Sequence, residues 1–330
     1  MFSKEDLNQP VYDYEVLERG YYCRDGFVFM GRYDSERKIS IYDRLVVRNP
    51  ETVEVNYRMA GPKSERSLED HIRLINELQL ESVTILAESI DFIIRCPSLK
   101  IVEIGIVSTA PDGFDYSPLY ELPCVREAYC STAYGTYEHP HYTTVDLSRI
   151  KGLRKTRINS ERQLNYQTAP ELEHIDLLDC SWLKDLRQVC TNKNLKVICA
   201  YFCGLTTLDG IENAKNLEAL DLGYLRKLSD VSQITSVASS LKKFWIDASP
   251  KVKDFSFLHE LENLESLILY GSNKIPDLSF LDNMHHLKEF YFSMDILDGD
   301  LTRCLKIPYA YCKQGHRHYN LKNADLPKNR

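Results

Sequence analysis

An internal repeat in the second half of the chain limits the folds that it can adopt more than any other feature. Each copy opens with a leucine, and further apolar residues follow three and five positions later. The six opening residues are Leu172, Leu195, Leu217, Leu241, Leu264 and Leu287. They are separated by 23, 22, 24, 23 and 23 positions. A fixed period of roughly 20–50 residues is typical of stacked repeat architectures.

Each copy contains two apolar sets, which predict two different elements. The first set has alternate apolar positions, which predicts a short strand with one buried face. The second set is spaced by three, as in Ile275, Leu278 and Leu281, and predicts a helical or 3-10 turn against the same core. Neither element can bury its apolar side alone, so the copies must stack. We therefore expect an α/β fold in which the copies stack on one another.

The combined pattern resembles the leucine-rich repeat family, and within it the bacterial internalin-like type with repeats of about 22 residues. The copy from Leu264 to Leu281 carries the resemblance most clearly. Weaker copies open further upstream, at Leu80, Leu99, Val125 and Leu153. The resemblance implies a solenoid with a curved parallel β-sheet and with short helices or 3-10 turns on its convex side. It also implies a non-catalytic protein that recognises another protein through its concave face.

The region before the repeat has a different pattern. Apolar residues alternate in residues 27–57, which predicts strands. Ser67 and Asp70 form a capping pair for a helix whose apolar positions end at Leu78. We interpret residues 1–78 as an N-terminal β-rich cap with a helix. A separate small β-domain is the alternative interpretation.

The repeat and the C-terminal end complete the predicted organisation. We expect the leucine-rich repeat solenoid to span residues 79–306, and residues 307–330 to form a C-terminal cap strand and a tail. Alternating apolar residues from Ile307 onward predict the closing strand. The tail after Asn320 is polar, so we expect it to fray.

The repeat also predicts which side chains line the concave face. These are the residues two, four and six positions after each opening leucine, because they lie between the buried positions of the strand. Aromatic and acidic residues gather there, and we predict that they bind the partner: Asp176, Tyr201, Asp221, Trp245, Asp247, Tyr270 and Tyr291. Tyr and Trp are frequent binding hot spots, and the acids favour a partner with exposed Lys or Arg. The alternative is that strands favour aromatic residues whether or not they bind anything.

Composition limits the partner and the compartment. The chain has 41 Lys and Arg against 48 Asp and Glu, a net charge of −7, which argues against nucleic-acid binding and favours a basic protein partner. The first twenty residues lack the apolar segment of a signal peptide, and no apolar run approaches the roughly 18 residues of a membrane span. We therefore expect a cytoplasmic protein without a membrane partner. A more specific hypothesis is an immunity or antitoxin-like protein that masks a basic effector.

Ten cysteines need an explanation. Without an export signal we expect them to be reduced and mostly buried. Cys180 and Cys203 occupy the same turn position in successive copies, which predicts that they stack inside the turns. Cys199 lies between core positions and is expected to face outward. The spacing of these cysteines does not supply four convergent zinc ligands, so we expect neither a metal nor another cofactor.

Two further groups could carry chemistry, and a metal-dependent enzyme is the remaining alternative. One group lies near the C-terminus and contains Cys304, Cys312, His316 and His318. The other lies in a long connection and contains Glu138, His139, His141 and Asp146. We interpret the first as part of a polar cap and the second as a surface loop. Familiar catalytic signatures are missing from the sequence, so we expect a protein that is not an enzyme.

Overall fold

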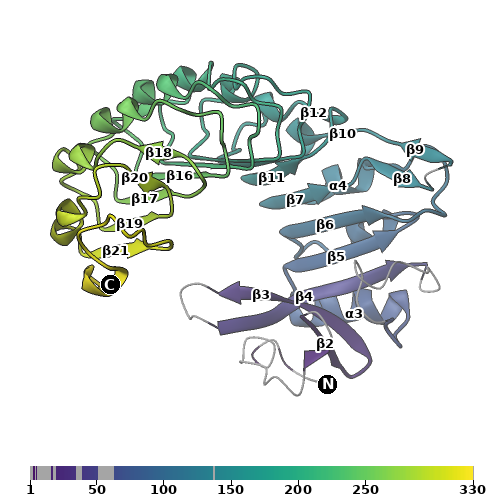
Figure 1. Cartoon of the computed structure of the whole chain (residues 1–330). Helices are drawn as coiled ribbons and strands as arrows, with labels where there is room; N and C mark the ends of the chain where they lie inside the picture. Colours follow the sequence, from purple (N-terminus) through teal and green to yellow (C-terminus); the bar gives the residue numbers. More distant parts are fainter. Residues whose placement is uncertain are drawn as a thin grey trace. The chain divides into compact units, whose positions relative to one another are not determined.

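The computed structural model describes residues 20–34, 39–50, 63–136 and 138–329, together with Ser3, Glu5, Val16 and Leu17. The chain divides into two compact units. The first comprises Met1–Thr156 and Ser160–Asn165, and the second comprises Arg157–Asn159 and Tyr166–Arg330. Figure 1 labels the helices and strands of both units.

The first unit contains a sheet that changes from antiparallel to parallel pairing. Its strands, in spatial order, are β1 (Val16–Leu17), β2 (Tyr21–Arg24), β3 (Phe27–Asp34), β4 (Ile39–Asn49), β5 (Ser82–Ala87), β6 (Ile101–Ile106), β7 (Glu127–Cys130) and β11 (Lys155–Ile158). Strands β1 to β4 pair in antiparallel fashion, and each pair from β4–β5 to β7–β11 is parallel. The antiparallel strands therefore belong to the same sheet as the first repeat strand, β5.

The strands and the helix predicted within residues 1–78 are largely confirmed. Strands β3 and β4 cover most of the alternating pattern, whereas residues 35–38 and 51–62, which include the end of that pattern, lie outside the described residues. Helix α3 (Leu68–Leu78) begins at the expected capping box, in which the Ser67 hydroxyl accepts from the backbone N–H of Asp70. The predicted boundaries at residues 78 and 306 remain an expectation.

Smaller elements complete the first unit. They are η2 (Asp91–Arg95), α4 (Ser117–Glu121), β8 (Ala133–Gly135), β9 (Pro140–Tyr142), β10 (Val145–Asp146), η3 (Leu147–Arg149) and β12 (Gln163–Leu164), where η denotes a 3-10 helix. Strands β8 and β9 form an antiparallel hairpin, and β10 pairs with β12 in parallel. No helix among the described residues is long and apolar enough to cross a membrane.

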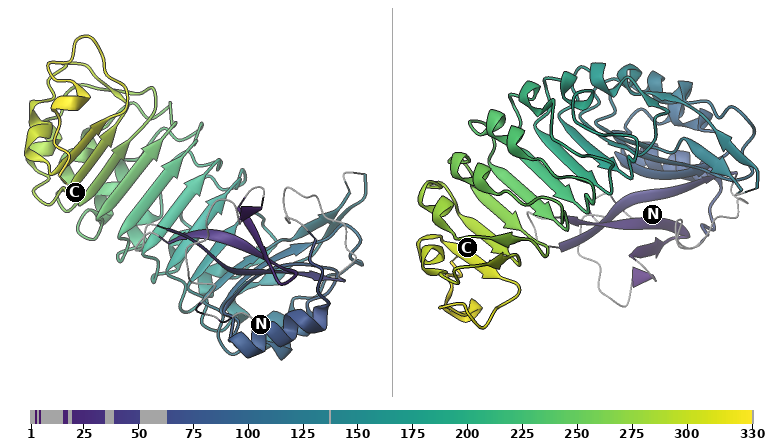
Figure 2. Two further views of the ribbon diagram at one scale, coloured as in Figure 1. Left: turned by 90° about the horizontal axis from the view of Figure 1, so that it is seen from below. Right: turned by 45° about the horizontal axis from the view of Figure 1, so that its top comes forward.

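The second unit contains the regular repeat. Its sheet is formed by β13 (His174–Leu178), β14 (Val197–Tyr201), β15 (Ala219–Gly223), β16 (Lys243–Asp247), β17 (Ser266–Leu269), β19 (Glu289–Phe292) and β21 (Tyr309–Cys312), all parallel and in sequence order. The 3-10 helices are η4 (Tyr166–Thr168), η5 (Val189–Thr191), η6 (Ile211–Asn213), η7 (Ser232–Val237), η8 (Ser256–Glu260), η9 (Ser279–Asp282), η10 (Thr302–Lys306) and η11 (Asn323–Asp325). A short parallel pair joins β18 (Lys274–Ile275) to β20 (Asp295–Ile296). The strands lie side by side along one side of this unit, and the 3-10 helices lie along the other (Figure 2).

The core of each coil consists of the residues that the repeat predicts. In the coil of β15, the opening residue Leu217 and the strand residues Leu220 and Leu222 are 0%, 1% and 0% exposed. Burial of such a side chain stabilises the fold by roughly 1.5–3 kcal/mol. Leu225 and Leu228 of the following turn are also buried against this core. The strand, the 3-10 helix and their shared core confirm an α/β fold of the leucine-rich repeat solenoid type.

The chain leaves several strands through a left-handed backbone position. Asp179, Phe202, Tyr224 and Ala248 occupy the same repeat position and have φ values of 57°, 57°, 56° and 44°. This conformation is uncommon for residues other than glycine. It reverses the chain sharply after each strand, so the next residues enter the turn and pack against the core.

The C-terminal end corrects one expectation. We expected the tail after Asn320 to fray, but Leu326 is only 2% exposed. The backbone N–H of Ala310 in β21 donates to the carbonyl of Pro327 at 2.9 Å. The tail folds back because β21 would otherwise leave backbone groups unpaired at the sheet edge. The predicted closing strand itself is confirmed as β21.

Candidate functional site

The strand register brings the predicted concave-face residues together in rows. Residues four positions after each opening residue are direct cross-strand neighbours, and they run in the order Asp176, Cys199, Asp221, Trp245, Ile268, Tyr291 and Tyr311. Neighbouring strands are about 4.8 Å apart, so adjacent members of a row are in contact range. Hereafter, the concave face means the residues at positions two, four and six of strands β13 to β21.

The concave face is partly open to solvent. The seven residues predicted to bind a partner all have intermediate exposure, whereas the alternate strand residues are buried. This is the pattern of a sheet with one face in the core and one face available. The structure therefore places all seven on one face, while their role in binding remains a prediction.

Tyr201 and Asp221 form a hydrogen bond across β14 and β15. The Tyr201 hydroxyl donates to Oδ2 of Asp221 at 2.6 Å. Gly223 allows this geometry, because a Cβ atom at that position would be 2.3 Å from Cε1 of Tyr201. The tyrosine ring thus lies across a residue without a side chain, and its hydroxyl reaches the carboxylate of the next strand.

The acids of the concave face interact with one another. Burial is the largest influence on the pKa of Asp221 and raises it, and the charges of Asp247 and Asp176 raise it further. Donation from Tyr201 acts in the opposite direction but does not cancel the increase. Burial and hydrogen bonding to Asp221 also raise the pKa of Tyr201. The middle of the concave face therefore carries negative charge that is poorly solvated.

Aromatic residues dominate the C-terminal part of the concave face. Trp245 and Tyr270 meet edge to face, with ring centroids 6.3 Å apart. Tyr291 is 5.3 Å from Tyr309 and 6.3 Å from Tyr311. The prediction missed Tyr309 and Tyr311 as members of this row. The signal was present, because both follow Ile307 at the spacing of the repeat, but small residues at the core positions obscured it.

Two lysines already lie over this aromatic surface. Nζ of Lys313 is 4.9 Å from the centroid of Tyr270. Nζ of Lys328 is 5.3 Å from the centroid of Tyr309 and 5.2 Å from that of Tyr311. These are cation–π distances, so the tyrosines accept ammonium groups in their present conformation.

The cysteines divide as the repeat predicts. The Cys180 thiol donates to the carbonyl of Ile158 at 3.2 Å, and the Cys203 thiol donates to that of Leu177 at 3.4 Å. Both are buried in the turns, whereas Cys199 is partly exposed on the concave face. Sγ of Cys199 lies 3.8 Å from Nε2 of His174. His174 was not predicted as a site residue, and its role depends on the register between β13 and β14.

The C-terminal Cys/His group does not converge as a unit. Cys304 and Cys312 are buried, and burial raises the pKa of Cys304 to about 12. His316 and His318 lie instead beside Asp295. The ring of His318 also bonds through Nε2 to the carbonyl of Ile296 at 2.9 Å. The two histidines therefore belong to a different cluster from the one that we predicted.

The residues of the long connection are also separated. His141 pairs with Asp112 and stacks on Tyr134, with ring centroids 5.5 Å apart. Asp146 accepts from the backbone N–H of Ser148 and so caps η3. Within the described part of the chain, three or more metal-ligand side chains converge only at His174, Asp176 and Cys199 and at Asp295, His316 and His318.

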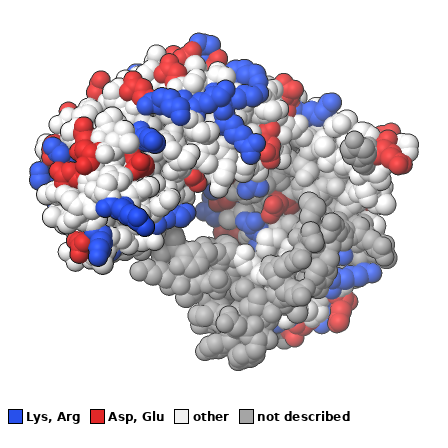
Figure 3. Space-filling model, viewed as in Figure 1, with Lys and Arg blue, Asp and Glu red and all other residues white. Residues whose placement is uncertain are grey.

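Charged residues also form a regular ladder directly after the opening residues of the repeat. Acidic and basic side chains alternate along it, in the order Glu173, Lys196, Glu218, Lys242, Glu265 and Lys288. The pairs Lys196–Glu173, Lys242–Glu218 and Lys288–Glu265 have N–O distances of 2.8, 3.2 and 2.6 Å. Figure 3 likewise shows both signs of charge on the visible surface. The ladder is an exposed set of ion pairs that neutralise each other, so we do not assign it a binding role.

Solved structures similar to this chain include bacterial internalins, the type that the repeat pattern resembles. An internalin (InlF) from Listeria monocytogenes is 16% identical, with a TM-score of 0.48, and the match covers 73% of this chain and 70% of that chain. Internalin C2 from the same species is 18% identical, with a TM-score of 0.42 and coverage of 54% and 81%. A leucine-rich repeat protein of Leptospira interrogans is 11% identical, with a TM-score of 0.37 and coverage of 75% and 81%. No protein-family model and no curated protein sequence matches the chain.

Proposed function

We propose that the protein binds another protein through the concave face, and that the bound surface of the partner carries Lys or Arg. The observation that carries the proposal is the combination of three partly exposed aspartates with the aromatic side chains Trp245, Tyr270 and Tyr291 on the same face. The structural neighbours share too little sequence to transfer a partner to this chain. The proposal therefore rests on the residues of the concave face themselves.

The aromatic part of the concave face supplies contact area at low entropic cost. Trp245 and Tyr291 project from strands that are paired on both sides, and Tyr270 directly follows β17, which is also paired on both sides. Such side chains lose few rotamers on binding, and Trp and Tyr are enriched among residues that dominate binding energy. A partner that covers this row would bury rigid apolar surface.

The acidic part of the concave face favours a cationic partner. Asp176 and Asp247 both raise the pKa of Asp221, which means that the negative charges repel one another. A Lys or Arg side chain placed among them would replace this repulsion with attraction. Binding should then weaken as ionic strength rises, because salt screens charges near the surface.

The positions of Lys313 and Lys328 support the same inference for the aromatic part. Each places an ammonium group over tyrosine rings of the concave face. A cation over an aromatic ring is stabilised by roughly 0.5–1 kcal/mol at an exposed site. The surface thus has the chemistry to accept basic side chains along its length.

Site-specific photocrosslinking tests the proposal. A photoreactive amino acid would replace Ile268, which lies in the row between Trp245 and Tyr291. The matched control would replace Phe202, which is 50% exposed but lies in a turn. In a lysate of the source organism, we expect a specific protein to be crosslinked from position 268 and not from position 202.

Substitutions then assign the crosslink to the concave face. Trp245→Ala with Tyr270→Ala should abolish it, and raised salt should weaken it. The control pair, Phe202→Ala with Tyr224→Ala, removes a stacked aromatic pair from the turns and should leave it unchanged. The proposal is contradicted if the crosslink still forms in the Trp245→Ala and Tyr270→Ala variant. It is also contradicted if only the control substitutions remove the crosslink. A basic effector as the crosslinked partner would favour the immunity hypothesis.

A further inference from the structure

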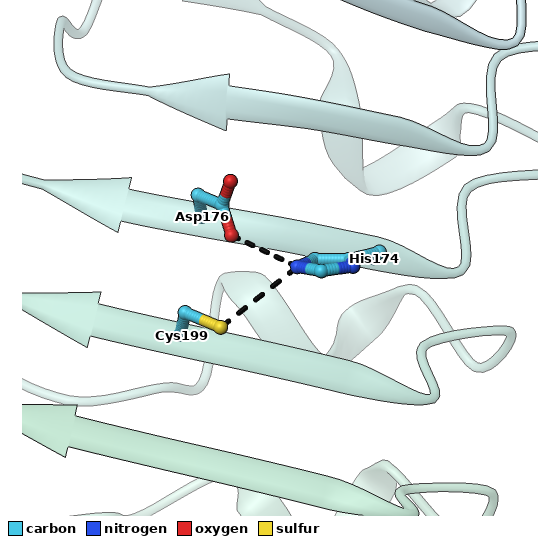
Figure 4. Close-up of side chains that lie close together, drawn as sticks. All are labelled: His174, Asp176 and Cys199. Atoms are coloured by element: carbon cyan, nitrogen blue, oxygen red, sulfur yellow. Dashed lines mark hydrogen bonds and ion pairs between the residues drawn. The ribbon is translucent and has the colours of Figure 1, made fainter. Parts of the chain in front are cut away.

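We propose that His174, Asp176 and Cys199 form a binding site for a zinc ion on the concave face. His174 and Asp176 lie two positions apart on β13, so their side chains project from the same side of the strand. Cys199 is the direct cross-strand neighbour of Asp176 on β14. Figure 4 shows one ring nitrogen of His174 facing both the Asp176 carboxylate and the Cys199 sulfur.

The three candidate ligand atoms converge on one point. Nε2 of His174 is 2.9 Å from Oδ1 of Asp176 and 3.8 Å from Sγ of Cys199. All three atoms lie within 4.8 Å of one another. In a tetrahedral zinc site, ligand bonds of about 2.0–2.3 Å place an N and an O ligand about 3.3 Å apart, and an N and an S ligand about 3.6 Å apart. The two distances from Nε2 of His174 therefore differ from these values by only a few tenths of an ångström.

The geometry favours metal binding over a catalytic Cys–His–Asp arrangement. In a proton relay, the acid contacts one ring nitrogen and the nucleophile contacts the other. Here the same nitrogen of His174 faces both Asp176 and Cys199. A single nitrogen cannot orient towards the acid and accept a proton from the thiol at the same time. Convergence of all three groups on one point is what a shared cation requires.

The donor set indicates the kind of metal. A thiolate, an imidazole and a carboxylate are all established zinc ligands, whereas Mg²⁺ and Ca²⁺ prefer oxygen alone. The His174 and Asp176 side chains are 26% and 23% exposed. The site is therefore open on the solvent side, and the fourth ligand would be water or a side chain of a bound partner. Three protein ligands with an open position distinguish this arrangement from a closed structural zinc site.

The second cluster offers an internal comparison. Asp295, His316 and His318 also gather ligand atoms. However, Nε2 of His318 bonds to the carbonyl of Ile296, which is not one of the candidate ligands, so a metal at this nitrogen would have to break that bond. Among the described residues, no such backbone bond ties up Nε2 of His174. We therefore assign zinc binding to the first cluster.

Metal binding by the purified full chain tests the proposal without a partner, so its result is independent of the proposed function. The protein would be treated with a chelator and titrated with Zn²⁺ against a chromophoric competitor. We expect one equivalent to bind. Titration with Co²⁺ should give the intense visible bands of a tetrahedral site and a near-ultraviolet charge-transfer band from a thiolate.

Variants identify the ligands. Cys199→Ser and His174→Gln should each weaken binding by more than the roughly 10–100-fold that loss of an outer-shell contact costs. Cys199→Ser should also remove the charge-transfer band. The controls are Cys23→Ser, which removes an exposed thiol elsewhere, and His318→Gln in the second cluster. Both should bind zinc as the wild type does, and circular dichroism should show that every variant is folded.

Three results would overturn the assignment. The first is a wild-type protein that loses zinc to a weak competitor. The second is unchanged affinity after Cys199→Ser or His174→Gln. The third is loss of binding in His318→Gln, which would move the site to the second cluster.

Discussion

The substitution Tyr201→Phe removes one oxygen atom and leaves the ring in place over Gly223. In the native protein, the Tyr201 hydroxyl donates to Oδ2 of Asp221 at 2.6 Å. Among the described residues, no other side chain hydrogen bonds to Asp221. The variant therefore leaves a partly buried carboxylate without its donor, in the neighbourhood of two further aspartates.

The size of the effect follows from the charge and the burial of the pair. A hydrogen bond to a charged group contributes about 1.5–3 kcal/mol when it is well shielded from water. Both residues are only partly buried, so solvent screening reduces this contribution. We expect Tyr201→Phe to lower the free energy of unfolding by about 1–2 kcal/mol at neutral pH.

The effect should depend on pH with a definite sign. The folded-state pKa of Asp221 is raised, so ionised Asp221 destabilises the fold at neutral pH, and this cost disappears as pH falls through that pKa. The hydrogen bond from the Tyr201 hydroxyl lowers the pKa of Asp221 and so reduces this destabilisation. Once Asp221 is protonated, only a neutral hydrogen bond of about 0.5–1.5 kcal/mol remains to be lost. The stability difference between the wild type and the variant should therefore shrink on acidification.

Tyr270→Phe is the matched control. Tyr270 occupies the same repeat position, but the structure gives its hydroxyl no hydrogen-bond partner among the described residues. We expect a change within about 0.5 kcal/mol, as for most surface substitutions. Urea unfolding of both variants, followed by circular dichroism at about pH 7 and about pH 4, measures the difference. Equal losses in the two variants, or a loss for Tyr201→Phe that grows on acidification, would refute the reasoning.

Three further predictions concern the turns and the core. Asn192→Ala should lower the free energy of unfolding by about 2–4 kcal/mol in urea unfolding, because the buried Asn192 amide donates to two backbone carbonyls at 3.2 and 2.9 Å. The control Asn194→Ala, at an exposed position, should lower it by less than about 1 kcal/mol, and equal losses in the two variants would contradict the prediction. Gly210→Ala should lower the free energy of unfolding by about 2 kcal/mol or more, because φ of Gly210 is +99° and a Cβ atom would lie 2.3 Å from backbone atoms of the preceding coil. Thermal unfolding measures this loss, and an unchanged Tm would rule out the close approach. Burial raises the pKa of Cys190 to about 12. Iodoacetamide should therefore label the exposed Cys23 in the native protein and Cys190 only after unfolding, as measured by peptide mass spectrometry. Labelling of Cys190 in the native protein would argue against its burial.

The regular part of the fold could be predicted because the repeat makes every local signal point to the same structure. Spacing alone located strands such as β15 and β16, because alternate apolar residues in short copies have one way to bury their side chains. The spacing also placed Asp221 and Trp245 on one face of the sheet, because coils of nearly equal length stack with their strands in register. Cys180 and Cys203 were correctly assigned to the turns for the same reason.

The irregular ends were harder to predict because their partners are not set by spacing. The tail after Asn320 is polar and carries no periodic signal, yet it pairs with β21, whose edge would otherwise be unpaired. Tyr309 and Tyr311 were assigned to the closing strand but not to the concave face, because Ala310 and Cys312 fill the core positions that larger apolar residues occupy in other coils.

The sequence by itself determined the stacked architecture and the side of the sheet on which each residue lies, because both depend on the period of apolar residues. Only the tertiary structure decided which side chains meet. His174 and Cys199 are 25 residues apart and belong to different repeat positions, and Tyr201 reaches Asp221 only because Gly223 leaves room for its ring. Such contacts depend on side-chain rotamers and on the lateral fit of neighbouring strands, and a one-dimensional pattern contains neither.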